Sequence, residues 1–120
     1  MKHVKTIGII GAGLSGIVTA KTCIDYGYEV KVFEKEPELG GVWASTRRYP
    51  GITTQNPKDT YCFTELPMPK HFPEWPTGGQ VQSYLSDYAK KFNVFPRILF
   101  SREITNIEFH DNKWEISGNN

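Results

Sequence analysis

The chain has 120 residues with 14 basic and 13 acidic side chains, a net charge of +1, and is long enough for one small domain with one core. Its basic residues form no block, which argues against nucleic acid as a partner, and its apolar runs are too short to span a membrane. The first residues lack the apolar stretch of a secretion signal, so we expect a cytoplasmic protein.

The first part of the chain predicts a strand, a glycine-rich turn, a helix and a second strand. The apolar run 6–10 leads into Gly11-Ala12-Gly13-Leu14-Ser15-Gly16, a helical segment follows, and the run 28–34 ends on Glu34. A G-x-G-x-x-G motif with a strand before it, a helix after it and an acidic residue at the end of the next strand is typical of a dinucleotide-binding βαβ unit. The alternative is a tight turn in an ordinary α/β protein.

Each glycine of this motif has a separate role in the predicted unit. Gly11 lets the chain turn sharply out of the strand, and Gly13 lets the backbone approach a pyrophosphate. Gly16 allows the helix to pack closely on the first strand, while the N–H groups of the helix N-terminus face the anion. Glu34 is placed where its carboxylate accepts both hydroxyls of a ribose.

The rest of the chain predicts a loop, a helix, a strand and a hairpin. Residues 44–76 are rich in Pro, Gly, Thr and aromatic residues without a clear period, which indicates a long loop with at most one helical turn. From residue 77, apolar side chains at i, i+3, i+4, i+7, i+8 and i+11 predict an amphipathic helix whose aromatic residues belong to the core. This helix leads to a parallel strand over 97–100, and a β-hairpin over 104–116 follows.

A family resemblance emerges when the motifs are taken in series. The glycine motif, Ala20, Gly27, Glu34 and Gly40-Gly41 resemble the extended FAD fingerprint of the glutathione-reductase type. The continuation into Val42-Trp43 resembles flavin-containing monooxygenases and their Baeyer–Villiger relatives. The later segments 48–51, 54–58, 61–63, 66–69 and 72–77 also resemble members of these families.

The resemblance implies an α/β fold, a Rossmann-like FAD-binding domain of the glutathione-reductase type, incomplete and with a C-terminal β-hairpin. It implies that residues 1–120 are the N-terminal part of the FAD-binding domain and that the NADPH domain is absent, since the chain has one glycine fingerprint. The implied function is that of an NADPH-dependent flavoprotein monooxygenase acting on nitrogen, sulfur or carbonyl groups of small molecules, with FAD and NADPH as cofactors. Whether the chain is itself an enzyme stays open.

The predicted cofactor contacts follow from the motif and from the resemblance. Val42, Trp43, Gln55 and Asn56 match family positions near FAD, and the family's active-site asparagine corresponds to either Gln55 or Asn56. The Gly40-Gly41 pair is either a surface turn or a second cofactor contact. The complete set of predicted FAD-binding residues is Gly11, Ala12, Gly13, Leu14, Ser15, Gly16, Glu34, Lys35, Gly41, Val42, Trp43, Gln55 and Asn56.

Two further functions compete with a monooxygenase: a non-catalytic module that binds FAD or its ADP half, and a truncated remnant without activity. No side chain has the setting of an acid, base or nucleophile, so we assign no catalytic residue. We also assign no metal site, since the three histidines are scattered singly, and we expect Cys23 and Cys62 to be free thiols. The first strand would be an open edge, so we expect self-association.

Overall fold

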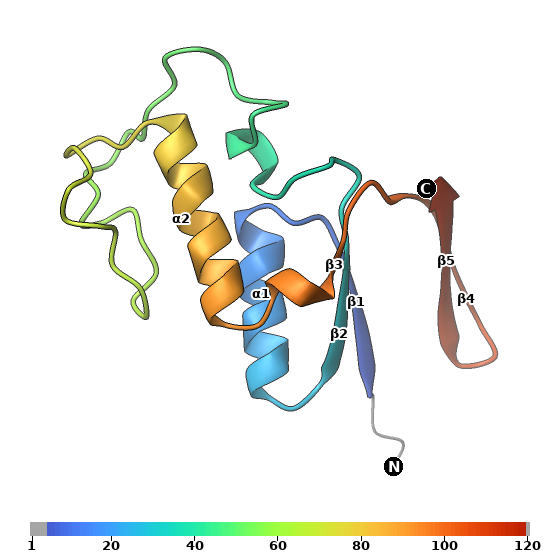
Figure 1. The fold of residues 1–120 in the computed structure, drawn as a ribbon. Helices are drawn as coiled ribbons and strands as arrows, with labels where there is room; N and C mark the ends of the chain where they lie inside the picture. The colour runs from blue at the N-terminus through green and yellow to red at the C-terminus, as the bar shows by residue number, and fades with distance from the viewer. Residues whose placement is uncertain (1–4, 120) are drawn as a thin grey trace.

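The computed structural model of the chain describes residues 5–119 and has three layers. Two α-helices lie on one side of a three-stranded sheet, and a β-hairpin lies on the other side (Figure 1). The order of elements is β1 (Thr6–Ile10), α1 (Leu14–Asp25), β2 (Glu29–Phe33), the 3-10 turn η1 (Gly41–Trp43), α2 (Gly78–Lys91), the 3-10 turn η2 (Phe95–Arg97), β3 (Ile98–Leu99), β4 (Glu103–His110) and β5 (Lys113–Asn119). The α/β class predicted from the sequence is confirmed.

The unit β1–α1–β2 is the predicted βαβ unit. β1 and β2 pair in parallel from Thr6 opposite Glu29 to Ile10 opposite Phe33. Alternate residues of β2 point to the helix side, and Val30 and Val32 are buried there with Ile17 and Ala20 of α1. The alternation explains why β2 places the next residue of the same face, Glu34, in a buried position directly after the strand.

Helix α2 confirms the predicted amphipathic stripe. It begins with a capping box in which the Thr77 hydroxyl accepts a hydrogen bond from the Gln80 N–H, and the Gln80 side chain accepts one from the Thr77 N–H. The predicted apolar positions within the helix are all buried: Val81, Tyr84, Leu85, Tyr88 and Ala89. The helix then leads through η2 to β3, which pairs in parallel with β2. β3 is shorter than the predicted strand over 97–100, because Arg97 belongs to η2 and the strand ends at Leu99.

Residues 44–76 form the predicted long loop, and they contain no helix or strand, only isolated β-bridges. The one short helical turn of this region, η1, lies just before them. The phenol of Tyr84 holds the loop on α2, because it accepts a hydrogen bond from the Phe63 N–H at 2.8 Å and donates one to the Leu66 carbonyl at 2.5 Å. Burial raises the pKa of Tyr84 to about 12.

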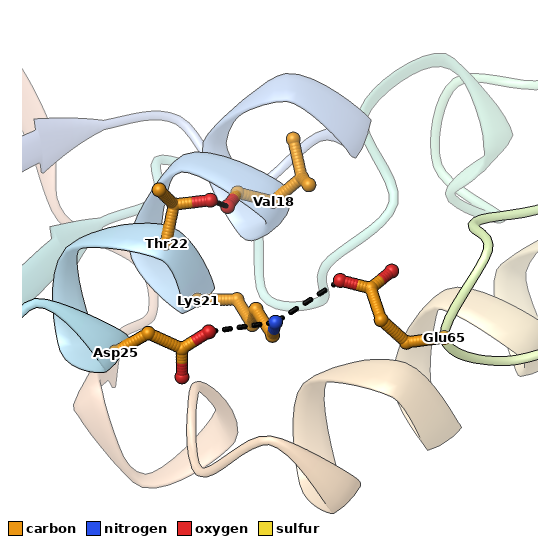
Figure 2. Close-up of polar contacts among 5 residues, drawn as sticks. All are labelled: Val18, Lys21, Thr22, Asp25 and Glu65. Atoms are coloured by element: carbon orange, nitrogen blue, oxygen red, sulfur yellow. Dashed lines mark hydrogen bonds and ion pairs between the residues drawn. The ribbon is translucent and has the colours of Figure 1, made fainter.

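The loop is also attached to α1 by an ion pair (Figure 2). The Lys21 ammonium lies 2.6 Å from the Asp25 carboxylate one helical turn on, and 3.0 Å from the Glu65 carboxylate of the loop. Hydrogen bonds to these carboxylates raise the pKa of Lys21, and the hydrogen bond from Lys21 lowers the pKa of Glu65. The contact joins segments that are 44 residues apart in the sequence.

The hairpin β4–β5 confirms the predicted C-terminal hairpin. Its turn residues Asp111 and Asn112 have φ values of 54° and 59°, the left-handed conformation that two-residue hairpin turns require. The hairpin forms its own sheet and does not pair with β1. It approaches the face of β1 at Ile116, whose methyl group lies 3.9 Å from the position of a Cβ on Gly8. β1 therefore has an unpaired edge among the described strands, as the sequence predicts.

Two smaller expectations concern the cysteines and the membrane. Cys23 and Cys62 are free thiols, as predicted, although both are only half-buried. Among residues 5–119, no helix has the length and apolar character needed to cross a membrane.

Candidate functional site

A cleft of about 730 Å³ lies where β1 and β2 end. Its walls come from the glycine-rich turn, the start of α1, the segment after β2, η1 and the first residues of the hairpin. In an open α/β sheet, ligands bind at the carboxyl ends of the strands. Ten of the predicted cofactor residues line this cleft: Gly11, Gly13, Leu14, Ser15, Gly16, Glu34, Lys35, Gly41, Val42 and Trp43.

The glycine-rich turn has the geometry that the motif predicts. Gly11 has a φ of 103°, a conformation that side chains rarely adopt. A Cβ on Gly16 would lie 1.9 Å from the carbonyl oxygen of Gly11, so only glycine lets α1 start this close to β1. Helix α1 has no side-chain cap at Gly13. Its first N–H groups have no partner within the helix, and they face the cleft as an anion site would require.

The Gly40–Gly41 pair packs against this turn. The Gly40 N–H donates a 2.9 Å hydrogen bond to the Ala12 carbonyl. A Cβ on Gly41 would lie 3.1 Å from the Cα of Gly13, and Gly41 has a φ of 59°. The pair therefore approaches the backbone of the glycine-rich turn closely, and Gly41 also lines the cleft, where the predicted cofactor contact would lie.

Glu34 connects the glycine-rich turn to the segment after β2 through its carboxylate. Its side chain is 6% exposed, its Oε1 accepts a 2.8 Å hydrogen bond from the Ala12 N–H, and its Oε2 accepts one of the same length from the Glu36 N–H. Each carboxylate oxygen can accept a second hydrogen bond, so both remain able to accept from ribose hydroxyls. Ala12 itself is buried and does not line the cleft; its N–H contributes by holding Glu34.

The charges of the cleft suit an anionic ligand. Its lining has three cationic side chains, Lys35, Arg47 and Arg102, against two acidic ones, Glu34 and Glu103. Arg48 has a different role: its guanidinium donates to the Trp43 carbonyl at 2.8 Å and to the Gln82 side chain at 2.7 Å, joining η1 to α2.

The sequence analysis missed the cleft residues Tyr61, Arg102, Glu103 and Ile104. Arg102 lies three residues after the end of β3, and Glu103 and Ile104 begin β4; the end of a parallel strand beside β2 was a signal that could have indicated them. Gln55 and Asn56 are exposed and do not line the cleft. Their contact with a flavin ring stays a prediction.

The hairpin brings His110 together with two glutamates that the sequence analysis did not connect with it. Glu108 pairs with Glu115 across the strands, and the Nε2 of His110 lies 3.1 Å from the Glu115 carboxylate. One donor atom from each residue lies within 4.8 Å of the others. The grouping depends on the strand register, and all three residues are exposed.

Comparison with known proteins gives the same family throughout. A family model described as "Flavin-binding monooxygenase-like" matches residues 4–119. Over 93% of its own length, the chain is 30% identical to dimethylaniline monooxygenase [N-oxide-forming] 2 of Cavia porcellus. It is 32% identical to human flavin-containing monooxygenase 2 over 86% of its length. It spans 23% and 21% of these relatives.

Solved structures share the fold. A structure of cyclohexanone monooxygenase with bound ε-caprolactone superposes with a TM-score of 0.82 at 27% identity and covers 95% of this chain and 23% of that enzyme. S-allyl-L-cysteine S-oxygenase from Allium sativum gives a TM-score of 0.84 at 23% identity and covers 95% of this chain and 32% of that enzyme.

Proposed function

The chain belongs to the flavin-binding monooxygenase-like family, and from this membership we propose that its cleft binds FAD for an NADPH-dependent monooxygenase. FAD and NADPH are the cofactors of the family. We propose that residues 1–120 form the N-terminal part of the FAD-binding domain and that the NADPH site lies outside them. The proposed substrates are small molecules with a nucleophilic nitrogen or sulfur, or a carbonyl group.

One observation carries this proposal: the uncapped start of α1 and the buried carboxylate of Glu34 line the same cleft. The helix N-terminus favours a pyrophosphate through its free N–H groups and its dipole. Glu34 offers acceptors for ribose hydroxyls. An adenine dinucleotide presents both groups at adjacent positions, so this arrangement matches its ADP half.

The remaining predicted contacts are assigned by their place in the cleft. We propose that Lys35 and Gly41 flank the ADP half, and that Val42 and Trp43 extend the contact toward the flavin. The ring of Trp43 packs against that of Tyr61, which also lines the cleft and lies edge-on with its centroid 5.8 Å away. Gln55 and Asn56 remain our candidates for the flavin ring, and only one of them is required there.

Bound FAD would supply the redox chemistry of oxygenation, and the residues of this chain would bind and orient it. The glycine turn and Glu34 hold the nucleotide, and η1 with Trp43 excludes water from one side of the cleft. No residue of the cleft is assigned as a general acid, base or nucleophile.

A non-catalytic FAD- or ADP-binding module is the second candidate function. It requires only the pyrophosphate and ribose contacts that line this cleft. Both candidates predict a bound flavin spectrum, whereas a remnant without function predicts none. Oxidation of NADPH by the flavin-loaded chain would support the enzyme and would contradict the placement of the NADPH site outside residues 1–120, whereas both candidates are compatible with a loaded chain that leaves NADPH unchanged.

The experiment that tests the site uses Gly13→Ala. A Cβ on Gly13 would lie 3.5 Å from the Cα of Gly41, an ordinary contact, and the φ of −81° suits alanine. The fold should therefore tolerate the methyl group, while the pyrophosphate loses its close approach to the backbone. Equilibrium dialysis with FAD should show at least tenfold weaker binding. Gly79→Ala, on the exposed start of α2 outside the cleft, is the matched control, and equal FAD retention in both variants would refute the assignment.

We also propose that the chain associates with itself through the free edge of β1. Among residues 5–119, no strand pairs with that edge, so its backbone groups are unpaired beside Ile10, which is 52% exposed. Light scattering after size-exclusion chromatography should show dimers or larger species at micromolar concentration, and a stable 13.7 kDa monomer would contradict this. The cytoplasmic location stays a prediction.

A further inference from the structure

The end of the cleft beyond Glu34 holds a cation that the glycine fingerprint does not include. Arg102 directly precedes β4 and lines the cleft together with Glu34 and Lys35. Its backbone N–H donates a 2.8 Å hydrogen bond to the Glu34 carbonyl, and the preceding residue, Ser101, donates one of 3.1 Å to the Glu36 carbonyl. The position of Arg102 is therefore fixed to the same backbone segment that carries the ribose acceptor.

The side chain of Arg102 is available to a ligand. It is exposed, and among residues 5–119 its guanidinium has no hydrogen-bond or ion-pair partner. This differs from Arg48, which is engaged by Trp43 and Gln82. An exposed arginine that lines a cleft without an internal partner keeps its planar face free.

The order of groups in the cleft places this arginine beside the base of a nucleotide. If a pyrophosphate binds at the start of α1 and a ribose at Glu34, the base lies on the far side of Glu34 from the helix. The cleft residues that come directly after Glu34, or next after β3, in the chain are Lys35, Arg102, Glu103 and Ile104, and none of them is aromatic. Phe33 also lines the cleft, but it precedes Glu34 on β2 and its ring lies near Gly8 and the hairpin, on the opposite face of the sheet. The guanidinium of Arg102 is the one cationic planar group among these four residues, and arginine stacks well on aromatic rings.

We propose that Arg102 is the adenine platform of the cleft, with its guanidinium stacked on the purine face. The inference rests on the proposed function, since it requires a nucleotide in this cleft. It predicts that Arg102 contributes to binding of the base and contributes little to binding of the phosphates.

The test measures ADP and inorganic pyrophosphate binding to the whole chain by calorimetry. Arg102→Ala should weaken ADP binding about three- to tenfold and should change pyrophosphate binding by less than twofold. Arg102→Phe keeps a stacking face without the charge, so it should restore ADP binding to within twofold of wild type. Arg102→Lys keeps the charge without the planar face and should behave like the alanine variant. Lys113→Ala, an exposed cation of the hairpin outside the cleft, is the control.

The outcomes separate this inference from the function on which it rests. If wild type binds ADP and Arg102→Ala binds it equally well, the platform is refuted while the cleft stands. Equal losses for ADP and pyrophosphate, with rescue by Arg102→Lys, would make Arg102 a phosphate contact and would also refute the platform. If wild type binds neither ADP nor FAD, the proposed function itself fails.

Discussion

Replacing Glu34 by glutamine tests whether its carboxylate holds the glycine turn before any ligand binds. In the structure each oxygen accepts a backbone N–H, one from Ala12 and one from Glu36. Glutamine has the same shape, but its NH₂ group is a donor and cannot accept. One of the two N–H groups must therefore lose its partner in a site where the side chain is 6% exposed.

The expected loss follows from that single unsatisfied donor. Leaving a buried donor without a partner costs about 1–3 kcal/mol, a large share of the roughly 5–15 kcal/mol of a typical domain. Urea unfolding of the ligand-free Glu34→Gln variant should show a decrease in the free energy of unfolding of this size. FAD binding should weaken as well, by about one to two orders of magnitude if the ribose also loses a charged acceptor.

Glu36→Gln is the matched control, because it removes the same charge two residues away and leaves both hydrogen bonds to Glu34 in place. If the ligand-free stability of the Glu34 and Glu36 variants were the same, the carboxylate would not be holding the turn. A Glu34 variant that kept its stability but lost FAD binding would restrict the residue to ribose recognition.

Three further changes test the packing around the site. Gly16→Ala should destabilise the chain by about 1–3 kcal/mol or more, measured by urea unfolding, because its Cβ would lie 1.9 Å from the Gly11 carbonyl oxygen; unchanged stability would mean that the turn can shift freely. Tyr84→Phe should release the loop, seen as faster limited proteolysis between residues 57 and 70, since two loop hydrogen bonds are lost; equal cleavage rates would contradict this. Lys21→Met should reduce the loss of folding stability at acid pH. Because the pKa of Glu65 is lowered, the stabilisation from its ion pair with Lys21 is present at neutral pH and is lost as the pH falls below the ordinary pKa of 4.5. Wild type should thus lose more stability than the variant in unfolding curves between about pH 5 and pH 3, and parallel pH profiles would refute the role of this ion pair.

The elements of the fold could be predicted because their patterns are local. The alternation of Val30, Val32 and Glu34 determines which face of β2 is buried, and the apolar stripe of α2 determines its packing side. The glycine motif was informative for the same reason: the constraint at Gly16 arises from a residue five positions earlier.

The missed features depend on contacts between distant segments. Arg102 reaches the cleft because β3 pairs with β2, and Glu34 supports Ala12 across 22 residues. The positions of Gln55 and Asn56 depend on the path of a loop with no periodic pattern, which is held by side chains such as Tyr84 from another element. Such positions follow from tertiary packing, so sequence patterns alone could not provide them.

An NMR titration of the isotope-labelled chain with FAD tests the central claim most directly. The claim predicts that the largest shifts of backbone amides occur at the glycine turn 11–16, at 34–35 and at 41–43, and that they saturate at one FAD per chain. The same amides should shift on addition of ADP, whereas the hairpin tip at 110–113 should not respond. Shifts confined to other segments, or no change at millimolar FAD, would contradict the account.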